Sequence, residues 1–297
     1  LSPVYQDFLL QELHLRIGNF NLFSHGGHPL KMIEFINDCL MTVFFLAVGL
    51  EIKRELLVGE LSSVRKAALP FIAACGGMVV PVVIYALSVA SGTPETRGMA
   101  IPMATDIAFS LGVLSLLGKR VPLSLKIFLT AFAVVDDIGG ILVIALFYSA
   151  DVAYGYLIAA AVLYVFLYYM GKFGVTQKIF FLFFGVIIWY LFLQSGIHST
   201  ISGVILAFVI PARPRLDAGK YIERIRDIIG EFPVSKSDNI VLTNAQIATL
   251  KQVERASDYV ISPLQSLEDN LHGAVSFVIL PLFAFANAGV VFSGSGN

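Results

Sequence analysis

Charged residues are scarce in this sequence. Asp, Glu, Lys and Arg account for 14% of the 297 residues, whereas a soluble domain carries about 25%. The 20 basic and 21 acidic residues nearly balance, so the charge gives no indication of nucleic-acid binding. The only two cysteines, Cys39 and Cys75, lie in apolar segments, which excludes a disulfide framework and a cysteine metal site. Apolar residues make up 57% of the chain, a composition that indicates an all-α protein with several membrane spans.

Eight segments are apolar enough to be expected as transmembrane helices, each of which needs about 20 mostly apolar residues. They are residues 32–50, 67–90, 98–118, 127–150, 152–171, 179–196, 197–212 and 273–292. Lys and Arg concentrate in every second connection, and such loops are cytoplasmic by the positive-inside rule. The expected cytoplasmic loops are residues 51–66, 118–126, 172–178 and 213–270.

This alternation predicts four parts of the chain. They are an extracytoplasmic segment over residues 1–31, a seven-span bundle over 32–212, a cytoplasmic insert over 213–270, and the eighth span with the C-terminal end over 271–297. The first residue is thereby placed outside the cell. Because the sequence starts with Leu and has no signal peptide, we expect at least one further N-terminal span in the complete protein.

Two soluble regions have recognisable local patterns. The alternation in LHLRIGNFNL, with Gly and Asn at its centre, predicts an exposed hairpin near residues 13–22. In the insert, DAGKYIERIRDIIGEF and TNAQIATLKQVERASDYV each have apolar residues at helical spacing, and Thr243 is a candidate N-cap of the second helix. These amphipathic helices could lie on the membrane or on the bundle.

Three carboxylates in expected spans are the main functional signal. Asp106 lies in the third span, and Asp136 and Asp137 are adjacent in the fourth. A carboxylate at the centre of a bilayer costs about 2.5–3.5 kcal/mol, so residues of this kind usually handle ions or protons. In the third span, Thr105 directly precedes Asp106, and its hydroxyl adds an oxygen suited to a hard cation such as Na⁺ or Li⁺.

Helix-disrupting residues occur in the second and third spans. Pro102 precedes Thr105 in the third, and the second contains Gly76, Gly77 and Pro81. An interrupted helix near the membrane midplane is typical of a transporter's ion site, because its ends offer dipoles and unpaired carbonyls. We therefore expect a discontinuous helix close to Asp106.

The two adjacent aspartates cannot serve the same point. Successive side chains on a helix diverge by about 100°, so we expect one to face a cavity with Asp106 and the other to meet a different partner. Burial and a neighbouring like charge favour the protonated form of a carboxyl group. A proton and a cation can then compete for one site, which is the minimum chemistry for exchange.

Other readings of these carboxylates remain open. They could form helix–helix hydrogen bonds in a non-transporting fragment or assembly partner, or line a channel. Two aspartates on different helices could also activate water in an intramembrane protease. The YD and GxGD patterns associated with such proteases are absent, and Asp136 and Asp137 occur in VVDDIGG.

Several long motifs resemble the NhaA family of sodium/proton antiporters. They are AIPMATDIAFSLGVLSLLGKRVPLSLKIFLTAFAVVDDIGG, INDCLMTVFFLAVGLE, GLEIKREL, SGIHSTISGVI and LPLFAFANAGV. The resemblance runs from the N-terminal hairpin to the end and omits only the loop around residues 213–265. It implies a bacterial inner-membrane antiporter, not an enzyme, that exports Na⁺ or Li⁺ in exchange for protons, needs no cofactor and is active at alkaline pH.

The resemblance also assigns roles to individual positions. Asp106 and Asp137 correspond to the carboxylates that bind the ion and the proton, and Thr105 lies at the break of a discontinuous helix. Asp136 corresponds to an aspartate that pairs with a lysine in a later span. A cytoplasmic cluster linked to pH sensing is matched by Glu51, Arg54, Glu55, Glu268 and His272.

Some of these positions also have simpler readings. Lys53 and Arg54 could serve only as positive-inside anchors. Histidine can change charge near neutral pH, but His272 lies at a membrane edge, where many histidines have no role. His198 matches a family histidine and is expected to be a packing or helix-start residue.

The sequence also departs from the family pattern. The family has twelve spans and two inverted repeats, whereas eight spans and one repeat are expected here, and no intramembrane lysine is present to pair with Asp136. We therefore expect weak or no transport from the 297-residue chain alone. The hairpin resembles the family's dimer contact, which predicts a homodimer formed through residues 11–21.

Overall fold

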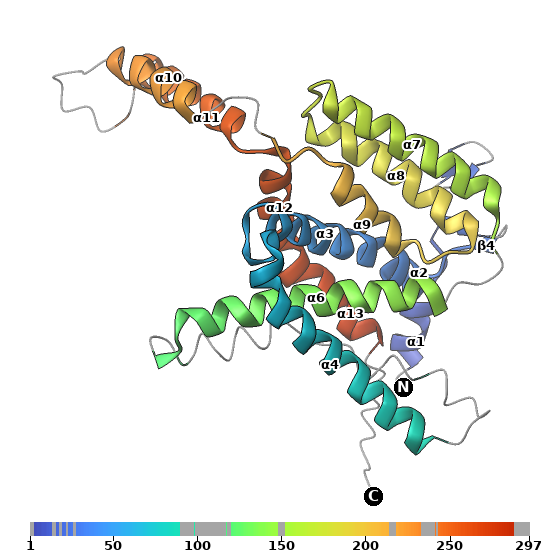
Figure 1. Ribbon diagram of the computed structural model, residues 1–297. Helices are drawn as coiled ribbons and strands as arrows, with labels where there is room; N and C mark the ends of the chain where they lie inside the picture. The colour runs from blue at the N-terminus through green and yellow to red at the C-terminus, as the bar shows by residue number, and fades with distance from the viewer. Residues whose placement is uncertain are drawn as a thin grey trace, which may run out of the picture.

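Helices dominate the computed structural model, which confirms the all-α expectation (Figure 1). The structure describes residues 3–89, 120–147, 152–213, 218–232 and 243–287, with short gaps at 14–15, 18–19, 22 and 26–27, and the single residues 98, 117 and 241. The longer helices are α3 (Met41–Val58), α4 (Val64–Ser88), α6 (Leu123–Phe147), α7 (Tyr154–Lys172), α8 (Lys178–Ser195), α9 (Thr200–Val209), α10 (Ala218–Gly230), α11 (Asn244–Val260) and α12 (Pro263–Ala274). The shorter helices are α1 (Pro3–Leu10), α2 (Met32–Glu34) and α13 (Leu280–Asn287).

The N-terminal segment contains the expected hairpin. Strands β1 (Arg16–Ile17) and β2 (Phe20–Asn21) pair antiparallel, with Ile17 opposite Phe20. A second pair, β3 (Ser24–His25) and β4 (His28–Pro29), follows directly. The alternation in the sequence therefore located the first hairpin correctly, but it gave no sign of helix α1 or of the second pair.

Five helices within the described part of the chain are long and apolar enough to cross a membrane. They are Met32–Val58, Ala67–Ser88, Tyr154–Lys172, Lys178–Ser195 and Pro263–Asn287. Helix α9 has ten residues and is about 15 Å long, half the thickness of the hydrocarbon core. The expected third span lies mostly outside the described residues, so the eight-span count stays a prediction.

The first and last of these helices each contain a π-helical segment. The segment η1 (Phe35–Leu40) joins α2 to α3, and η5 (Val275–Ile279) joins α12 to α13. The first helix continues to Val58, beyond the expected end at residue 50, and the last one starts at Pro263, ahead of the expected start at residue 273. The predicted boundary between residues 270 and 271 therefore falls inside a continuous helix.

The helix-disrupting residues of the second span do not interrupt its helix. Helix α4 runs without a break from Val64 to Ser88 and includes both Pro70 and Pro81. A proline removes one backbone hydrogen bond, and a helix in a membrane tolerates this loss where neighbouring groups make up for it. The break expected in the third span, near Pro102, lies outside the described residues.

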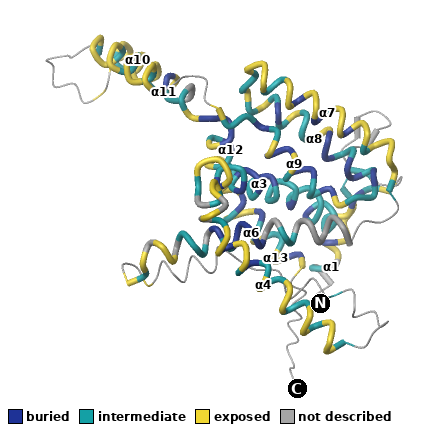
Figure 2. Tube along the Cα trace, viewed as in Figure 1, coloured by how far each residue is buried: buried dark blue, intermediate teal, exposed yellow. Residues whose placement is uncertain are grey.

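The core forms where α3, α7, α8, α9 and α12 meet. Its centre contains the fully buried side chains of Leu50, Leu167, Phe181, Ile188 and Ile210. The outward sides of α4 and α7 are exposed (Figure 2), and large apolar residues such as Ile72 and Val162 lie there. Exposed aliphatic surface along membrane-length helices is the surface that lipid covers.

Glycines allow α3 and α9 to approach closely. A Cβ at Gly49 would lie 2.8 Å from the Ala207 Cβ, and a Cβ at Gly203 would overlap the Thr42 carbonyl oxygen. Small residues at helix contacts are common in membrane proteins, because helix association there depends on close packing. The pair α3–α9 is therefore a close contact that larger side chains would force apart.

Candidate ion site and charge cluster

Asp136 lies on the buried side of α6, the helix that packs against α4. Only 4% of the residue is exposed, and Ala133, Val134 and Val135 around it in sequence are also buried. The carboxylate directly follows a buried apolar stretch of helix, as the sequence predicts. A buried charge is costly, which favours a functional role over a purely structural one.

The other expected ion-binding residues are only partly covered by the structure. Asp137 follows Asp136 in the backbone of α6. The Asp137 side chain itself, and the whole of Thr105 and Asp106, lie outside the described residues. Their assignment as ion and proton ligands stays a prediction.

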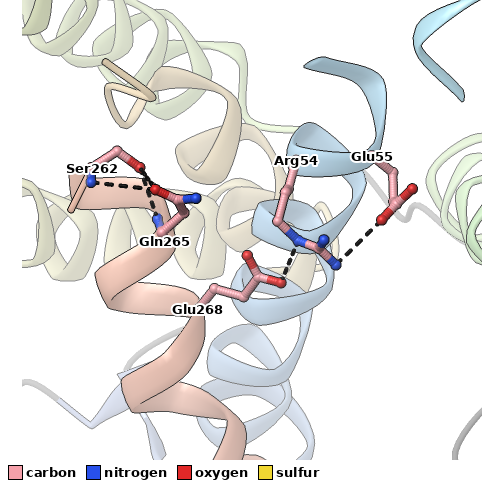
Figure 3. Close-up of polar contacts among 5 residues, drawn as sticks. All are labelled: Arg54, Glu55, Ser262, Gln265 and Glu268. Carbon is pink, nitrogen blue, oxygen red and sulfur yellow. Dashed lines mark hydrogen bonds and ion pairs between the residues drawn. The ribbon is translucent and has the colours of Figure 1, made fainter. Parts of the chain in front are cut away.

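Arg54 is the centre of an ion-pair cluster between α3 and α12 (Figure 3). Its Nε lies 2.9 Å from Glu268 Oε1, and its Nη2 lies 3.3 Å from Glu55 Oε1. Glu55 is buried although it is charged. The guanidinium therefore lies between two carboxylates that the resemblance assigns to one cluster.

Glu51 and His272 belong to the same neighbourhood. Glu51 precedes Glu55 by one helical turn, and the charges of Arg54, Glu55, Glu268 and His272 all act on it. The structure thus brings together the five residues that the sequence assigned to a pH-sensing cluster. A change in the protonation of one of these groups would alter the electrostatic energy of the others.

The N-terminus of α12 is fixed by a capping box. The Ser262 hydroxyl accepts a hydrogen bond from the Gln265 backbone N–H, and the Gln265 side chain accepts from the Ser262 backbone N–H (Figure 3). Pro263 occupies the first helical position, where its missing N–H costs nothing. This well-defined start places Glu268 opposite Arg54.

Lys53 holds the C-terminal end of α9. Its Nζ donates to the carbonyl oxygens of Ala207 (3.4 Å), Phe208 (2.8 Å) and Ile210. A helix end leaves its last carbonyls without intrahelical partners, and a cation there also interacts favourably with the helix dipole. The reading of Lys53 as only a positive-inside anchor is therefore incomplete.

Asp38 organises the opposite end of the same helix pair. Its backbone carbonyl oxygen accepts hydrogen bonds from Trp189 Nε1 and Ser199 Oγ, each at 3.1 Å, and Ser199 Oγ also lies 3.1 Å from Asp38 Oδ1. Asp38 is part of η1, and Ser199 is the N-cap residue of α9. Helix α9 is thus tied to the first span at both of its ends.

A cavity of about 540 Å³ opens beside Asp38. Its polar lining includes Glu12, His28, Lys31, Glu34 and His198. His198 is exposed and comes just before the α9 N-cap, so the helix-start reading fits and the packing reading does not. Within the described residues, no three His, Cys, Asp or Glu side chains form a group that could hold a metal ion.

Contacts distant in sequence show which chain segments share an end of the bundle. Lys178 Nζ donates to Ser266 Oγ at 2.6 Å, Arg54 pairs with Glu268, and Lys53 binds Ile210. The C-terminal ends of α3 and α9 and the N-terminal ends of α8 and α12 therefore meet at one end of the bundle. At the other end, Gln194 Nε2 donates to the Ser24 carbonyl oxygen.

Sequence reasoning did not identify the roles of Lys53 and Asp38. The partners of Lys53 lie more than 150 residues away in the chain, and backbone carbonyls leave no signature in a sequence. The only signal was position, because both residues are charged and lie near the ends of an apolar segment.

These features define a multi-pass helical membrane protein with a buried carboxylate and a charge cluster between two of its membrane-length helices. The family of Na⁺/H⁺ antiporter 1 matches residues 1–297. The chain therefore belongs to the Na⁺/H⁺ antiporter 1 family.

Individual relatives agree with this membership. The chain is 77% identical to the Na⁺/H⁺ antiporter NhaA of Bacteroides thetaiotaomicron over 297 residues, which is the whole chain and 68% of that protein. It is 78% identical to the protein of the same name from Bacteroides fragilis over 296 residues, again 68% of the relative. For the Porphyromonas gingivalis protein, the identity is 48% over 299 residues, or 99% of this chain and 66% of the relative.

Proposed function

We propose that this protein exchanges Na⁺ or Li⁺ for protons across the bacterial inner membrane, as a transporter and not an enzyme. The observation that carries the proposal is the buried Asp136 in an apolar helix, with Asp137 as its neighbour. The relatives, which are called Na⁺/H⁺ antiporters, support the choice of ions. The transported ions are cargo, and no cofactor takes part.

In this proposal, Asp106 and Asp137 are the carboxylates that bind either a cation or protons, and Thr105 contributes an oxygen ligand. Carboxylate oxygens suit a small hard cation, and the same oxygens take up protons once the cation leaves. Asp136, on the buried side of α6, positions the site through a separate partner. Because the two cargoes need the same oxygens, their binding is mutually exclusive, and opposite movement follows.

We assign pH regulation to the cluster of Glu51, Arg54, Glu55, Glu268 and His272. It lies between α3 and α12, which belong to the first and last of the membrane-length helices. Gain of protons by its carboxylates would remove the partners of Arg54 and weaken this contact. Activity at alkaline pH, when the ion pairs are intact, is consistent with that arrangement.

The segments 51–66, 118–126, 172–178 and 213–270 are proposed to be cytoplasmic. Three of these four are supported by the contacts of Lys53, Arg54 and Lys178, which gather at one end of the bundle. The N-terminal segment, with its β1–β2 hairpin, would then lie outside. A homodimer through residues 11–21 is part of the same proposal.

A vesicle assay tests the exchange. Because the relatives extend beyond the matched region, we would replace the matching residues of the B. thetaiotaomicron antiporter with this chain and express the chimera in a host without Na⁺/H⁺ antiporters. In inside-out vesicles, we expect Na⁺ and Li⁺, but not K⁺, to collapse a proton gradient at alkaline pH. A response no larger than that of empty-vector vesicles would favour a non-transporting assembly role.

The 297-residue chain is assayed in parallel. Weak or no transport by the chain, with full transport by the chimera, would fit the expectation that the site needs further sequence. Full transport by the chain alone would show that this expectation is wrong.

A further inference from the structure

The insert between α9 and α12 forms a helical hairpin that the transport site does not use. Helices α10 and α11 pack against each other and extend away from the other helices (Figure 1). Tyr221, near the start of α10, lies 2.9 Å from Ser257, near the end of α11, measured between the two hydroxyl oxygens. The two helices are therefore antiparallel, with their contact closed by this hydrogen bond at the base.

The helices expose aliphatic side chains even though they are paired. Tyr221, Ile225 and Ile228 of α10 are half-buried, as expected for the contact face. By contrast, Ile222 is 57% exposed, Ile229 58%, Ile247 37% and Leu250 46%. Pairing of α10 with α11 therefore leaves four large aliphatic residues in contact with the surroundings.

These four residues share one side of the hairpin. At about 100° per residue, Ile222 and Ile229 lie within about 20° of each other, and both are displaced in the same rotational sense from the α10 contact face. Ile247 and Leu250 are displaced in that sense from the α11 contact face, which the half-buried Gln246, Val253 and Ser257 mark. In an antiparallel pair, displacements in one sense bring both sets to the same side, so the four aliphatic residues share one face of the hairpin. The exposed Glu254 also lies on this face, closer to the base of the hairpin.

Cations border this face as in helices that lie on membranes. Arg226 is about 40° from Ile222 around α10, and Lys251 is about 40° from Ile247 around α11, whereas Asp227 lies on the far side of α10, about 140–160° from Ile222 and Ile229. Cations at the edge of an apolar face can extend to lipid headgroups, while acidic residues remain in water. Exposed cations further from the face are Lys220, Arg224 and Arg255.

The chain also holds the hairpin close to a bilayer surface. Two residues, Ile261 and Ser262, separate α11 from α12, so these two helix ends are within about 11 Å of each other. Helix α12 opens the membrane-length helix Pro263–Asn287. A helix of 25 residues is about 37 Å long, longer than a hydrocarbon core of about 30 Å, which leaves its first turns at the boundary.

We propose that the α10–α11 hairpin binds the surface of the membrane in which the protein is embedded, with Ile222, Ile229, Ile247 and Leu250 inserted among the headgroups of a leaflet that contains anionic lipid. An interfacial helix buries its apolar face about 5–10 Å into this region. The hairpin thereby anchors the end of the bundle that contains Arg54 and Glu268. The proposal does not depend on which ion is transported.

Site-directed fluorescence quenching tests this proposal on the whole chain. In a background with Cys39 and Cys75 replaced by Ser, a bimane probe is attached at Ile222→Cys, at Ile229→Cys, or at Asp227→Cys as the matched control on the other side of α10. The protein is reconstituted in phosphatidylcholine–phosphatidylglycerol vesicles. Brominated lipid should quench the probes at 222 and 229 at least about threefold more than at 227, and aqueous iodide should show the reverse order.

Two results would overturn the proposal. Equal iodide quenching at all three positions, without quenching by brominated lipid, would mean that the hairpin stands in water. Protection from both quenchers, with disulfide crosslinking of Ile222→Cys between molecules, would mean that a second copy covers the face.

A second variant guards against an effect of the probe itself. The probe is placed at Leu250→Cys, and Ile222→Asn is combined with Ile229→Asn. This double substitution should lower quenching of the probe by brominated lipid, because the apolar side chains of α10 that enter the membrane are lost. The residues Tyr221, Ile225 and Ile228, which contact α11, are unchanged. Unchanged quenching would contradict a shared membrane-binding face.

Discussion

Lys53 shows how much one side chain contributes when it binds a helix end. Its ammonium group serves three carbonyls at the end of α9, and replacement would leave them without that partner. We expect Lys53→Met to destabilise the protein by about 1.5–3 kcal/mol, the range for hydrogen bonds to charged groups. Unfolding in mixed micelles, followed by circular dichroism, measures the loss.

Two further variants separate the capping contact from general positive charge. Lys53→Arg keeps the charge and the donors and should recover part of the stability. The exposed Arg65→Met removes a cation at the same end and should change the stability little. Equal losses for Lys53→Met and Arg65→Met would contradict a specific capping role.

The Arg54–Glu268 pair should contribute less to stability than its position suggests. The Arg54 side chain is 36% exposed and that of Glu268 20%, so water and salt screen the pair. We expect a coupling of about 0.2–1 kcal/mol in a double-mutant cycle of Arg54→Gln and Glu268→Gln. A regulatory role should appear instead as a changed pH dependence of transport in the chimera, and a profile unchanged by Glu268→Gln would count against it.

At this scale, the sequence could predict chemistry but not distant contacts. The carboxylates in apolar segments and the five cluster residues are recognisable from their types and motifs. The hydrogen bonds of Lys53 to α9 and of Ser199 to Asp38 join segments more than 150 residues apart, so no local pattern could reveal them.

At the scale of helices, the close contact of α3 and α9 makes the strongest prediction. Gly203→Ala places a methyl group against the Thr42 carbonyl oxygen and forces the helices apart. We expect a loss of about 1–3 kcal/mol, as for overpacked cores, measured as a lower melting temperature in detergent. Gly76→Ala in α4 is the matched control, because nothing lies within 4 Å of its Cβ position. A similar loss for both variants would contradict a specific effect of the α3–α9 contact, because Ala by itself favours a helix over Gly.

Amphipathic helices and caps were accessible from the sequence, whereas helix continuity was not. Thr243 caps α11 as predicted, since a capping residue and its N3 partner are local in the chain. The unbroken α4, the π-helical segments and the early start of the last span depend on how neighbouring helices satisfy the backbone. Such packing is not encoded in a short window.

For the whole molecule, the orientation in the membrane is the main prediction. The end that contains Lys53, Arg54 and Lys178 should face the cytoplasm. In right-side-out spheroplasts, an impermeant thiol reagent should label Gln11→Cys but not Ser62→Cys, and in inside-out vesicles the pattern should reverse. Both residues are exposed, so labelling reports sidedness. Labelling of Ser62→Cys from outside would invert the proposed topology.

The sequence predicted the class of this molecule well because membrane spans and family motifs are long signals. The arrangement of helices around the core was not predictable, since it depends on glycines and side chains that meet only in the folded chain. The proposed ion site rests on the sequence at Thr105, Asp106 and Asp137, and on the structure at Asp136.

Transport by the chimera carrying Asp137→Asn probes the shared site for cation and proton. Asparagine keeps the size of the side chain but can neither bind a proton in exchange nor supply a negative charge to the cation. We expect Na⁺-driven collapse of the proton gradient to disappear in this variant, while the protein still reaches the membrane. Exchange at the rate of the unsubstituted chimera would contradict the assignment of Asp137 as a shared site for cation and proton.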